Sequence, residues 1–164
     1  MIKLIWQKDP FPHAIIDNYL PYDLFESLSS ELETSKSLIK VKFNTHIESK
    51  ASTSYKDTFS KENSRDLIKR MASDELKKMI AQQTGDVEIV SMGENMDFAG
   101  YSPYHITSNN GFLGAHVDHS SLENGKLRHV ANTIFYASKK WEKGWGGQTI
   151  LFSRNGLRKK VLID

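Results

Sequence analysis

Cysteine is absent from this chain of 164 residues. Its absence excludes disulfide frameworks, thiolate nucleophiles, and zinc or iron–sulfur sites with cysteine ligands. A metal ion in this protein must therefore be held by His, Asp, Glu or backbone oxygen atoms. Long apolar runs are also missing: no segment approaches the roughly 18–20 apolar residues that a membrane-spanning helix needs. The short apolar N-terminus becomes charged at Lys8 and Asp9, too early for a secretory signal. We expect a cytoplasmic protein that does not act at a membrane.

An excess of charge of one sign is lacking as well. The chain has 22 basic and 20 acidic residues, which gives a formal net charge of +2. This balance gives no reason to expect a nucleic-acid partner. Eight Phe, six Tyr and three Trp provide enough large side chains for a core. The length suits one domain that covers residues 1–164.

The first part of the chain, residues 1–85, has mainly helical patterns. The first expected helix covers about 21–35, with Pro21 at its first position and apolar residues at helical spacing. Ser64 is expected to cap a second helix, and a third runs from Ser73 to a stop at Gly85. Residues 44–63 are rich in Ser, Thr, Lys and Asn and are predicted to form a surface loop.

Residues 86–164 have the pattern of a β-structure, with short apolar runs between turn signals. The strongest turn signals are Asn109-Asn110-Gly111 and Glu123-Asn124-Gly125. Short strands with frequent turns favour an antiparallel sandwich or barrel, so the predicted fold class is α+β, a helical part followed by a β core. The expected strands cover about 86–91, 97–106, 112–118, 130–137, 148–153 and 159–163.

The tripeptide His116-Val117-Asp118 is the clearest chemical feature. On a strand, residues two apart point to the same face, about 7 Å apart along the backbone. An imidazole and a carboxylate so placed can converge on one cation. They make up two-thirds of the two-His-one-carboxylate triad that holds non-haem Fe(II) and leaves coordination positions open. An ordinary surface pair is the alternative interpretation. His119 points to the opposite face of such a strand, which makes it a poor third ligand.

The surroundings of this tripeptide resemble the 2-oxoglutarate/Fe(II)-dependent dioxygenases, specifically their prolyl-4-hydroxylase-like branch. The likeness follows the whole chain in order and is most specific over residues 111–152. It rests on the His-x-Asp segment, an Arg before an apolar strand that ends in a Tyr, a Trp-rich turn and a Gly-Gly before another apolar strand. These features are Arg128, Tyr136, Trp141, Trp145 and Gly146-Gly147. The N-terminal segment from Pro12 to Pro21 also resembles the entry segment of that branch.

The resemblance implies a double-stranded β-helix, or jelly roll, flanked by N-terminal helices. It implies Fe(II) bound by His116 and Asp118, with 2-oxoglutarate as co-substrate, O₂ as oxidant and ascorbate as an accessory reductant. The expected reaction converts 2-oxoglutarate to succinate and CO₂ and hydroxylates a C–H bond of a peptidyl or small-molecule substrate. The family's distal His and its basic 2-oxoglutarate anchor are expected beyond Asp118, yet no His follows His129.

The C-terminal strands of the family are therefore expected to be missing. We expect this chain by itself to be an incomplete, inactive domain that binds Fe(II) weakly and pairs with a second copy through open strand edges.

Further residues carry two interpretations each. Asn132 and Tyr136 share a face if their segment is a strand, so they are candidates for binding 2-oxoglutarate; the alternative is a buried asparagine beside a core tyrosine. Arg128 is a candidate for binding substrate or for supporting Asp118, or is a plain surface arginine. Two other functions stay open: a non-catalytic jelly-roll binding module with a partial metal site, and a hydrolytic zinc site of His116, Asp118 and His129.

Overall fold

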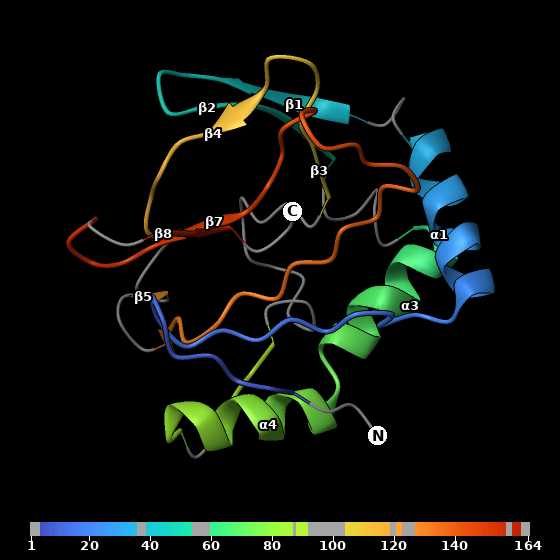
Figure 1. Ribbon diagram of the computed structural model, residues 1–164. Helices are drawn as coiled ribbons and strands as arrows, with labels where there is room; N and C mark the ends of the chain where they lie inside the picture. Colours follow the sequence, from blue (N-terminus) through green and yellow to red (C-terminus); the bar gives the residue numbers. More distant parts are fainter. Residues whose placement is uncertain are drawn as a thin grey trace.

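The structure is a computed structural model that describes residues 4–35, 39–53, 60–86, 88–91, 104–118, 121–122, 127–156 and 159–161. It is a mixed α+β fold: among the described residues, one helix, two strands and two further helices are followed by a series of short strands, and the paired strands are antiparallel (Figure 1). Its elements are α1 (Tyr22–Thr34), β1 (Ile39–Asn44), β2 (Glu48–Thr53), α3 (Glu62–Met71), α4 (Asp74–Thr84), β3 (His105–Ile106), β4 (Phe112–Leu113), β5 (Ser121–Leu122), β6 (Leu127–Arg128), β7 (Ile150–Phe152) and β8 (Lys159–Val161).

Helix α1 confirms the first expected helix and supplies much of the core. Leu28 is fully buried on this helix and packs with Leu20 and Leu32. Pro21 was expected at the first helical position but is the N-cap residue, with φ −53° and ψ 147°. Its extended ψ places it just outside the helix. At this position the missing N–H of proline costs no hydrogen bond of the helix.

Helix α4 begins and ends where the sequence predicts. The Ser73 hydroxyl accepts a hydrogen bond from the Leu76 backbone N–H at 3.4 Å, as an N-cap side chain does. Gly85 ends the helix in the left-handed conformation with φ +75°, where the lack of a Cβ avoids steric strain. Leu76 and Ile80 are the buried side chains of this helix.

The N-terminus of helix α3 is capped by a residue of another helix. Ser64 was expected to be the cap, but the helix begins at Glu62, so Ser64 lies inside the first turn. The carboxylate of Glu31, on α1, accepts hydrogen bonds from the backbone N–H groups of Asn63 and Ser64 at 3.0 and 2.8 Å. It also accepts from both side chains, at 2.9 and 2.6 Å. Glu31 thus satisfies the amides that a local N-cap would satisfy, and it ties α1 to α3.

Replacing Glu31 with Gln is expected to lower the free energy of unfolding by about 1–2 kcal/mol at neutral pH. Burial alone would raise the pKa of Glu31, but the hydrogen bonds from Ser64 and Asn63 outweigh it and lower the pKa below the usual 4.5. A carboxylate with a lowered pKa stabilises the fold at pH values above the unfolded pKa. That contribution disappears as the pH falls through the folded pKa.

Urea unfolding of the wild type and the Glu31→Gln variant between pH 3 and pH 7 measures this effect. The variant should lose stability less steeply in acid than the wild type. Glu142→Gln is a suitable control, because Glu142 is exposed. Parallel stability curves for the wild type and Glu31→Gln would show that Glu31 is not a cap.

Strands β1 and β2 form a hairpin where part of a loop was expected. The prediction of a loop over 44–63 is wrong for residue 44, which ends β1, for residues 48–53, which form β2, and for residues 62–63, which begin α3; residues 54–59 lie outside the described residues. Strand β2 pairs with β1 over the register Ile39↔Thr53 to Asn44↔Ser49. The Thr45 hydroxyl organises the turn by accepting from the N–H groups of Ile47 and Glu48, each at 3.2 Å. The small polar residues of β2 have no apolar alternation, but Ser52 and Thr53 are almost fully buried. Pairing and burial, rather than propensity, make this strand.

Strand β4 joins the same sheet and leads into the His-x-Asp segment. Phe112 and Leu113 pair with Ser49 and Glu48 of β2, and the Gly114 N–H donates to the Ile47 carbonyl at 2.7 Å. The expected strand over 112–118 is therefore much shorter, because its partner strand turns away at residues 45–47. A Cβ on Gly111 would lie 2.9 Å from the Ser49 carbonyl oxygen, and one on Gly114 would lie 3.1 Å from that of Ile47. Gly111 thus leaves room for the backbone of β2, and Gly114 leaves room for the backbone of the turn before β2.

The variant Gly111→Ala is expected to lose about 1–3 kcal/mol of stability. Its new methyl group would stand 2.6 Å from the Thr107 Cγ2 atom as well as against two backbone oxygens. Gly114→Ala is the matched comparison, since its closest contact is a longer 3.1 Å and its cost should be smaller. Equal denaturation midpoints for Gly111→Ala and the wild type would contradict the close approach of β4 to β2.

Residues 130–137 were expected to form a strand, yet they take part in no ladder among the described residues. They pack on α1 through side chains instead. The Phe135 ring lies 6.3 Å from the Phe25 ring and 6.4 Å from the Tyr19 ring. The Ser29 hydroxyl donates to the Ala137 carbonyl at 2.9 Å. Apolar contact with a helix therefore holds this segment without strand pairing.

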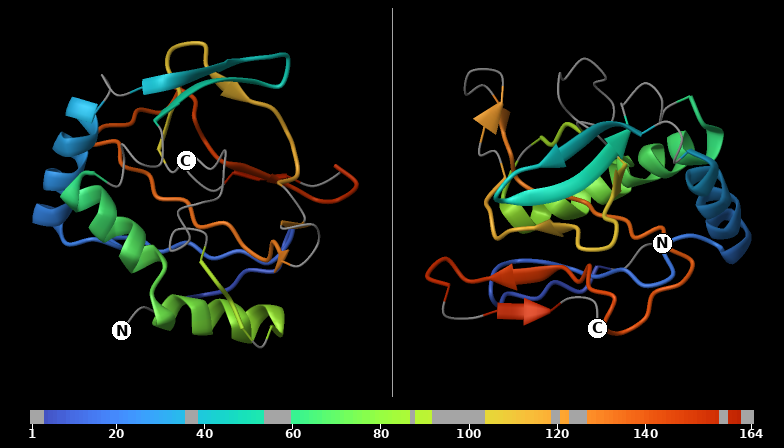
Figure 2. Two further views of the ribbon diagram at one scale, coloured as in Figure 1. Left: turned by 180° about the vertical axis from the view of Figure 1, so that it is seen from behind. Right: turned by 90° about the horizontal axis from the view of Figure 1, so that it is seen from above.

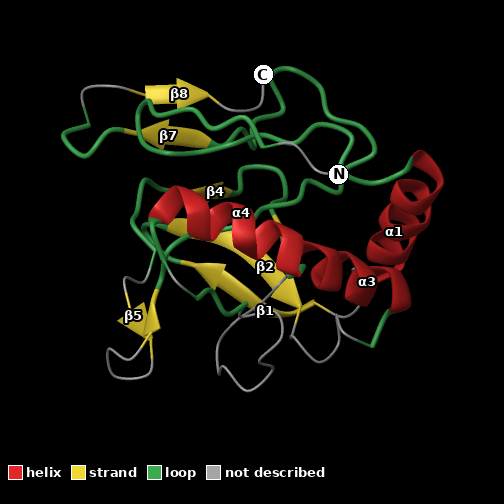
Figure 3. Ribbon diagram, turned by 90° about the horizontal axis from the view of Figure 1, so that it is seen from below, coloured by secondary structure: helices red, strands yellow, loops and turns green. Residues whose placement is uncertain are grey.

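The remaining strands form two hairpins apart from the main sheet. Strands β5 and β6 flank the predicted turn at 123–125, which itself lies outside the described residues. Strands β7 and β8 lie within the strands expected over 148–153 and 159–163 and pair with each other antiparallel, while residues 162–163 lie outside the described residues. Figures 2 and 3 show the β7–β8 hairpin away from β1 and β2, with loop segments between them.

Other sequence predictions in this part of the chain have mixed outcomes. Residues 86 and 88–91 form no strand, and of the strand expected over 97–106 only β3 is described. A closed jelly roll stays a prediction. Among the described residues, no helix is long and apolar enough to cross a membrane.

Candidate metal centre

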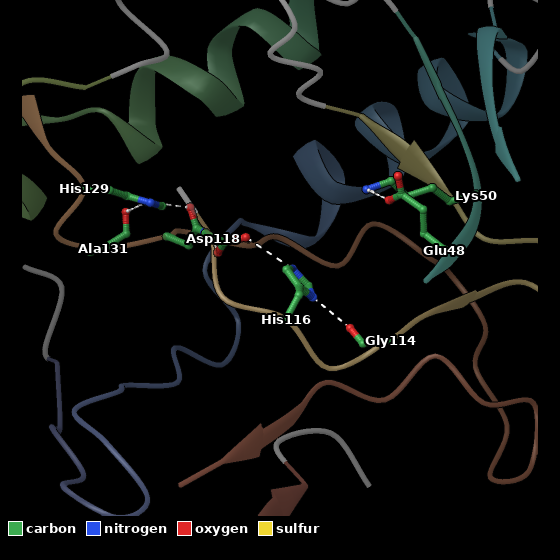
Figure 4. A network of polar contacts seen from close by, with 8 residues as sticks. Glu48, Lys50, Gly114, His116, Asp118, His129 and Ala131 are labelled. Atoms are coloured by element: carbon green, nitrogen blue, oxygen red, sulfur yellow. Dashed lines mark hydrogen bonds and ion pairs between the residues drawn. The ribbon is translucent and has the colours of Figure 1, made fainter. Parts of the chain in front are cut away.

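The His-x-Asp segment leaves β4 and runs along the surface, where its two polar side chains meet. The His116 Nε2 atom lies 3.2 Å from the Asp118 Oδ1 atom (Figure 4). The sequence predicts this proximity from a shared strand face. The proximity is present, although residues 114–118 belong to no strand. The two side chains are 43% and 47% exposed, so solvent and small molecules reach them.

The other nitrogen of the His116 ring identifies its tautomer. Nδ1 lies 2.8 Å from the Gly114 carbonyl oxygen, which can only accept a hydrogen bond. Nδ1 therefore carries a proton, and in the neutral ring Nε2 presents a lone pair toward the Asp118 carboxylate. Two lone pairs at 3.2 Å repel each other. The arrangement is favourable when a proton or a metal cation lies between them.

The Asp118 carboxylate is held from its other side by Asn132. The Asn132 Nδ2 group donates a hydrogen bond to Asp118 Oδ2, which leaves Oδ1 facing His116. The His129 Nε2 atom lies 3.1 Å from both the Ala131 carbonyl and Asn132 Oδ1. A chain of polar contacts thus runs from His129 through Asn132 and Asp118 to His116 and Gly114, and Figure 4 shows its two ends.

The positions of the two donor atoms agree with a shared cation. Two ligands that meet at right angles, with metal–ligand bonds of about 2.1 Å, are about 3.0 Å apart. The observed separation of 3.2 Å is close to this value. A nitrogen and a carboxylate oxygen also match the ligand types of a non-haem iron site. Within the described part of the chain, however, no group of three or more His, Asp or Glu side chains is placed to hold a metal.

Of the two other histidines considered as a third ligand, the structure describes only His129, and it does not complete this site. His129 uses Nε2 for hydrogen bonds with Ala131 and Asn132, so this nitrogen is not free for a metal. His119 lies outside the described residues. The donor set of the described residues therefore fits two positions of a three-residue triad.

Arg128 and Tyr136 have partners outside this network. The Arg128 guanidinium donates to Asp86 Oδ1 at 2.6 Å. Hydrogen bonds from Thr84 and Arg128 lower the pKa of Asp86. The Tyr136 hydroxyl bonds to the Thr149 hydroxyl. Asn132 and Tyr136 thus contact different groups, and their roles toward 2-oxoglutarate, like the role of Arg128 toward substrate, stay predictions.

Sequence reasoning missed the contribution of backbone carbonyl groups to the site. Gly114 orients His116, and Ala131 orients His129. Gly114 lies two positions before its histidine, and Ala131 lies two positions after its histidine. Backbone acceptors carry no residue-type signal, so only the path of the chain reveals them. Comparisons with known protein families, curated proteins and solved structures found no match for this chain.

Proposed function

We propose that the chain is an Fe(II)- and 2-oxoglutarate-dependent dioxygenase with a jelly-roll type of core. Its reaction would hydroxylate a C–H bond of a peptidyl or small-molecule substrate. The observation that supports this proposal is the contact of His116 Nε2 with Asp118 Oδ1 at 3.2 Å, combined with the contact of His116 Nδ1 with the Gly114 carbonyl oxygen at 2.8 Å. A histidine that donates Nδ1–H to a backbone carbonyl and offers Nε2 beside a carboxylate has the arrangement typical of metal-binding histidines.

The chain's own residues would bind and orient the metal. His116 would supply Nε2, and its bond to Gly114 would fix the ring plane. Asp118 would supply Oδ1 and the negative charge. When bound, Fe(II) together with 2-oxoglutarate and O₂ would supply an oxidant strong enough to hydroxylate an unactivated C–H bond. The exposure of both side chains would leave the remaining coordination positions open to co-substrate and O₂.

A hydrolytic zinc site is less well supported, because it needs His129 as a ligand. The His129 Nε2 atom makes hydrogen bonds with the Ala131 carbonyl and with Asn132 Oδ1. A surface ion pair between a protonated His116 and Asp118 is the simplest non-catalytic alternative. Such an exposed pair contributes about 0–1 kcal/mol to stability.

Turnover of 2-oxoglutarate tests the proposal. The full gene product, supplied with Fe(II), ascorbate, O₂ and 2-oxoglutarate, is expected to form succinate. The Asp118→Ala variant should form none above the rate without protein, because the carboxylate ligand is lost. His46→Ala is the control, since His46 is exposed in the β1–β2 turn. Metal binding without succinate formation would favour a non-catalytic binding module, and turnover with zinc but without 2-oxoglutarate would favour a hydrolase.

A further inference from the structure

We propose that Asn132 is the positioning residue of the metal site: its amide, held by the His129 ring, turns the Asp118 carboxylate so that Oδ1 faces His116. This inference rests on the proposed function, because it explains how the chain presents one carboxylate oxygen to a cation. It also gives Asn132 a role different from direct contact with 2-oxoglutarate.

The direction of each hydrogen bond follows from the Ala131 carbonyl. That oxygen can only accept, so the His129 Nε2 atom at 3.1 Å must carry a proton. The atom of Asn132 that lies 3.1 Å from the same Nε2 must then be its amide oxygen. The amide nitrogen consequently faces Asp118, whose ionised carboxylate can only accept. The amide oxygen and the amide nitrogen of Asn132 thus each have a partner that allows only one orientation of the side-chain amide.

The orientation matters because a carboxylate has two oxygens that compete for a cation. Asn132 donates to Oδ2, and this leaves Oδ1 as the oxygen that faces the His116 lone pair. Without the amide, rotation about the Cβ–Cγ bond of Asp118 would exchange the two oxygens. An exposed side chain has little else to prevent this rotation.

The backbone around Asn132 provides a firm base for this role. Phe135 and Ala137, further along the same segment, pack on the core cluster of α1. On the other side, Arg128 ends the β5–β6 hairpin and bonds to Asp86. Asn132 is therefore carried by a segment that is fixed at both ends.

The first test measures binding of Co²⁺, a probe that is stable in air, by the wild type and by variants. Asn132→Ala is expected to weaken Co²⁺ binding about 10- to 100-fold, the range found for groups that orient metal ligands. His129→Gln should bind nearly as well as the wild type, because a glutamine Nε2 group can donate to Asn132 in place of the ring. Thr133→Ala is the matched control on the adjacent exposed residue and should change binding less than 2-fold. Unchanged Co²⁺ affinity in Asn132→Ala would overturn the positioning role while leaving the metal site intact.

The second test needs no metal and so separates this inference from the proposed function. In the metal-free protein, the side-chain amide protons of Asn132 are followed by ¹⁵N–¹H NMR. The hydrogen bond to Asp118 should move one of them downfield and slow its exchange with water. Asp118→Ala should abolish both effects, and Thr133→Ala should not. If the wild type binds no Co²⁺, the proposed function fails, but an Asn132 signal that responds to Asp118→Ala still supports the link. An Asn132 signal typical of a free amide would overturn it.

Discussion

Alanine at His116 or at Asp118 is expected to weaken binding of Fe(II) or Co²⁺ by at least about 100-fold. Each change removes a ligand atom, so the loss should exceed the roughly 10- to 100-fold loss that follows when a group that only orients a ligand is removed. Both side chains are close to half exposed, so neither substitution should change the free energy of unfolding by more than about 0.5 kcal/mol. Isothermal titration of the metal and urea unfolding of the same samples measure the two effects.

The His46→Ala variant distinguishes metal binding at His116 and Asp118 from unspecific binding by any exposed histidine. His46 is also exposed, but it lies in the turn between β1 and β2. Its metal affinity should equal that of the wild type. Equal losses in the His46 and His116 variants would indicate scattered, unspecific binding, and an unchanged affinity in the His116 variant would contradict the proposed ligand set.

The variant Leu28→Ala is expected to lower the free energy of unfolding by about 3–5 kcal/mol. Leu28 has no exposed surface and belongs to the core cluster in which Leu28 and Leu32 of α1 pack with Leu20, with Phe135 packed against them. The lost methyl groups remove buried apolar area, and the cavity that remains costs more because neighbouring side chains fill it only in part. A domain of this size has a total stability of about 5–15 kcal/mol, so the variant should lose a large share of it.

Urea unfolding at neutral pH measures this change, with Ile5→Ala as the control for an exposed apolar residue. Ile5 is 65% exposed, and its truncation should change stability by less than about 0.5 kcal/mol. A loss below about 1 kcal/mol in Leu28→Ala would mean that this cluster is not the centre of the core.

Local sequence signals predicted the helices well but not everything that stabilises them. Periodicity located α1, and Ser73 with Gly85 located both ends of α4, because each of these signals acts within a few residues. The cap of α3 could not be predicted in this way. Glu31 is 32 residues away from Asn63 in the sequence, and only packing of α1 against α3 brings its carboxylate there.

The strands were harder to predict because their partners decide them. The β2 sequence has small polar residues without alternation, yet it pairs with β1, β3 and β4. Residues 130–137 have the apolar content of a strand, yet α1 covers Phe135 and Ala137 instead of a neighbouring strand. In both places tertiary contacts override the local preference.

The sequence predicted the two residues at the centre of the candidate site, His116 and Asp118, but not the groups that surround them. The spacing of His116 and Asp118 indicated that their side chains would meet, and they do. Sequence reasoning paired Asn132 with Tyr136 on the basis of strand alternation, but Asn132 contacts Asp118 and Tyr136 contacts Thr149. That difference follows from the absence of a ladder over 130–137, since alternation fixes faces only where a strand exists.

The most direct measurement of the central claim is the ¹⁵N NMR spectrum of the His116 ring during titration with Zn²⁺, a diamagnetic substitute for Fe(II). We expect that Nδ1 keeps its proton and its bond to Gly114, while the Nε2 signal shifts as one equivalent of metal binds. Asp118→Ala should weaken that shift strongly. An Nε2 that carries a proton at every Zn²⁺ concentration, with no change in its signal, would show that His116 and Asp118 form a simple ion pair and would contradict the metal site.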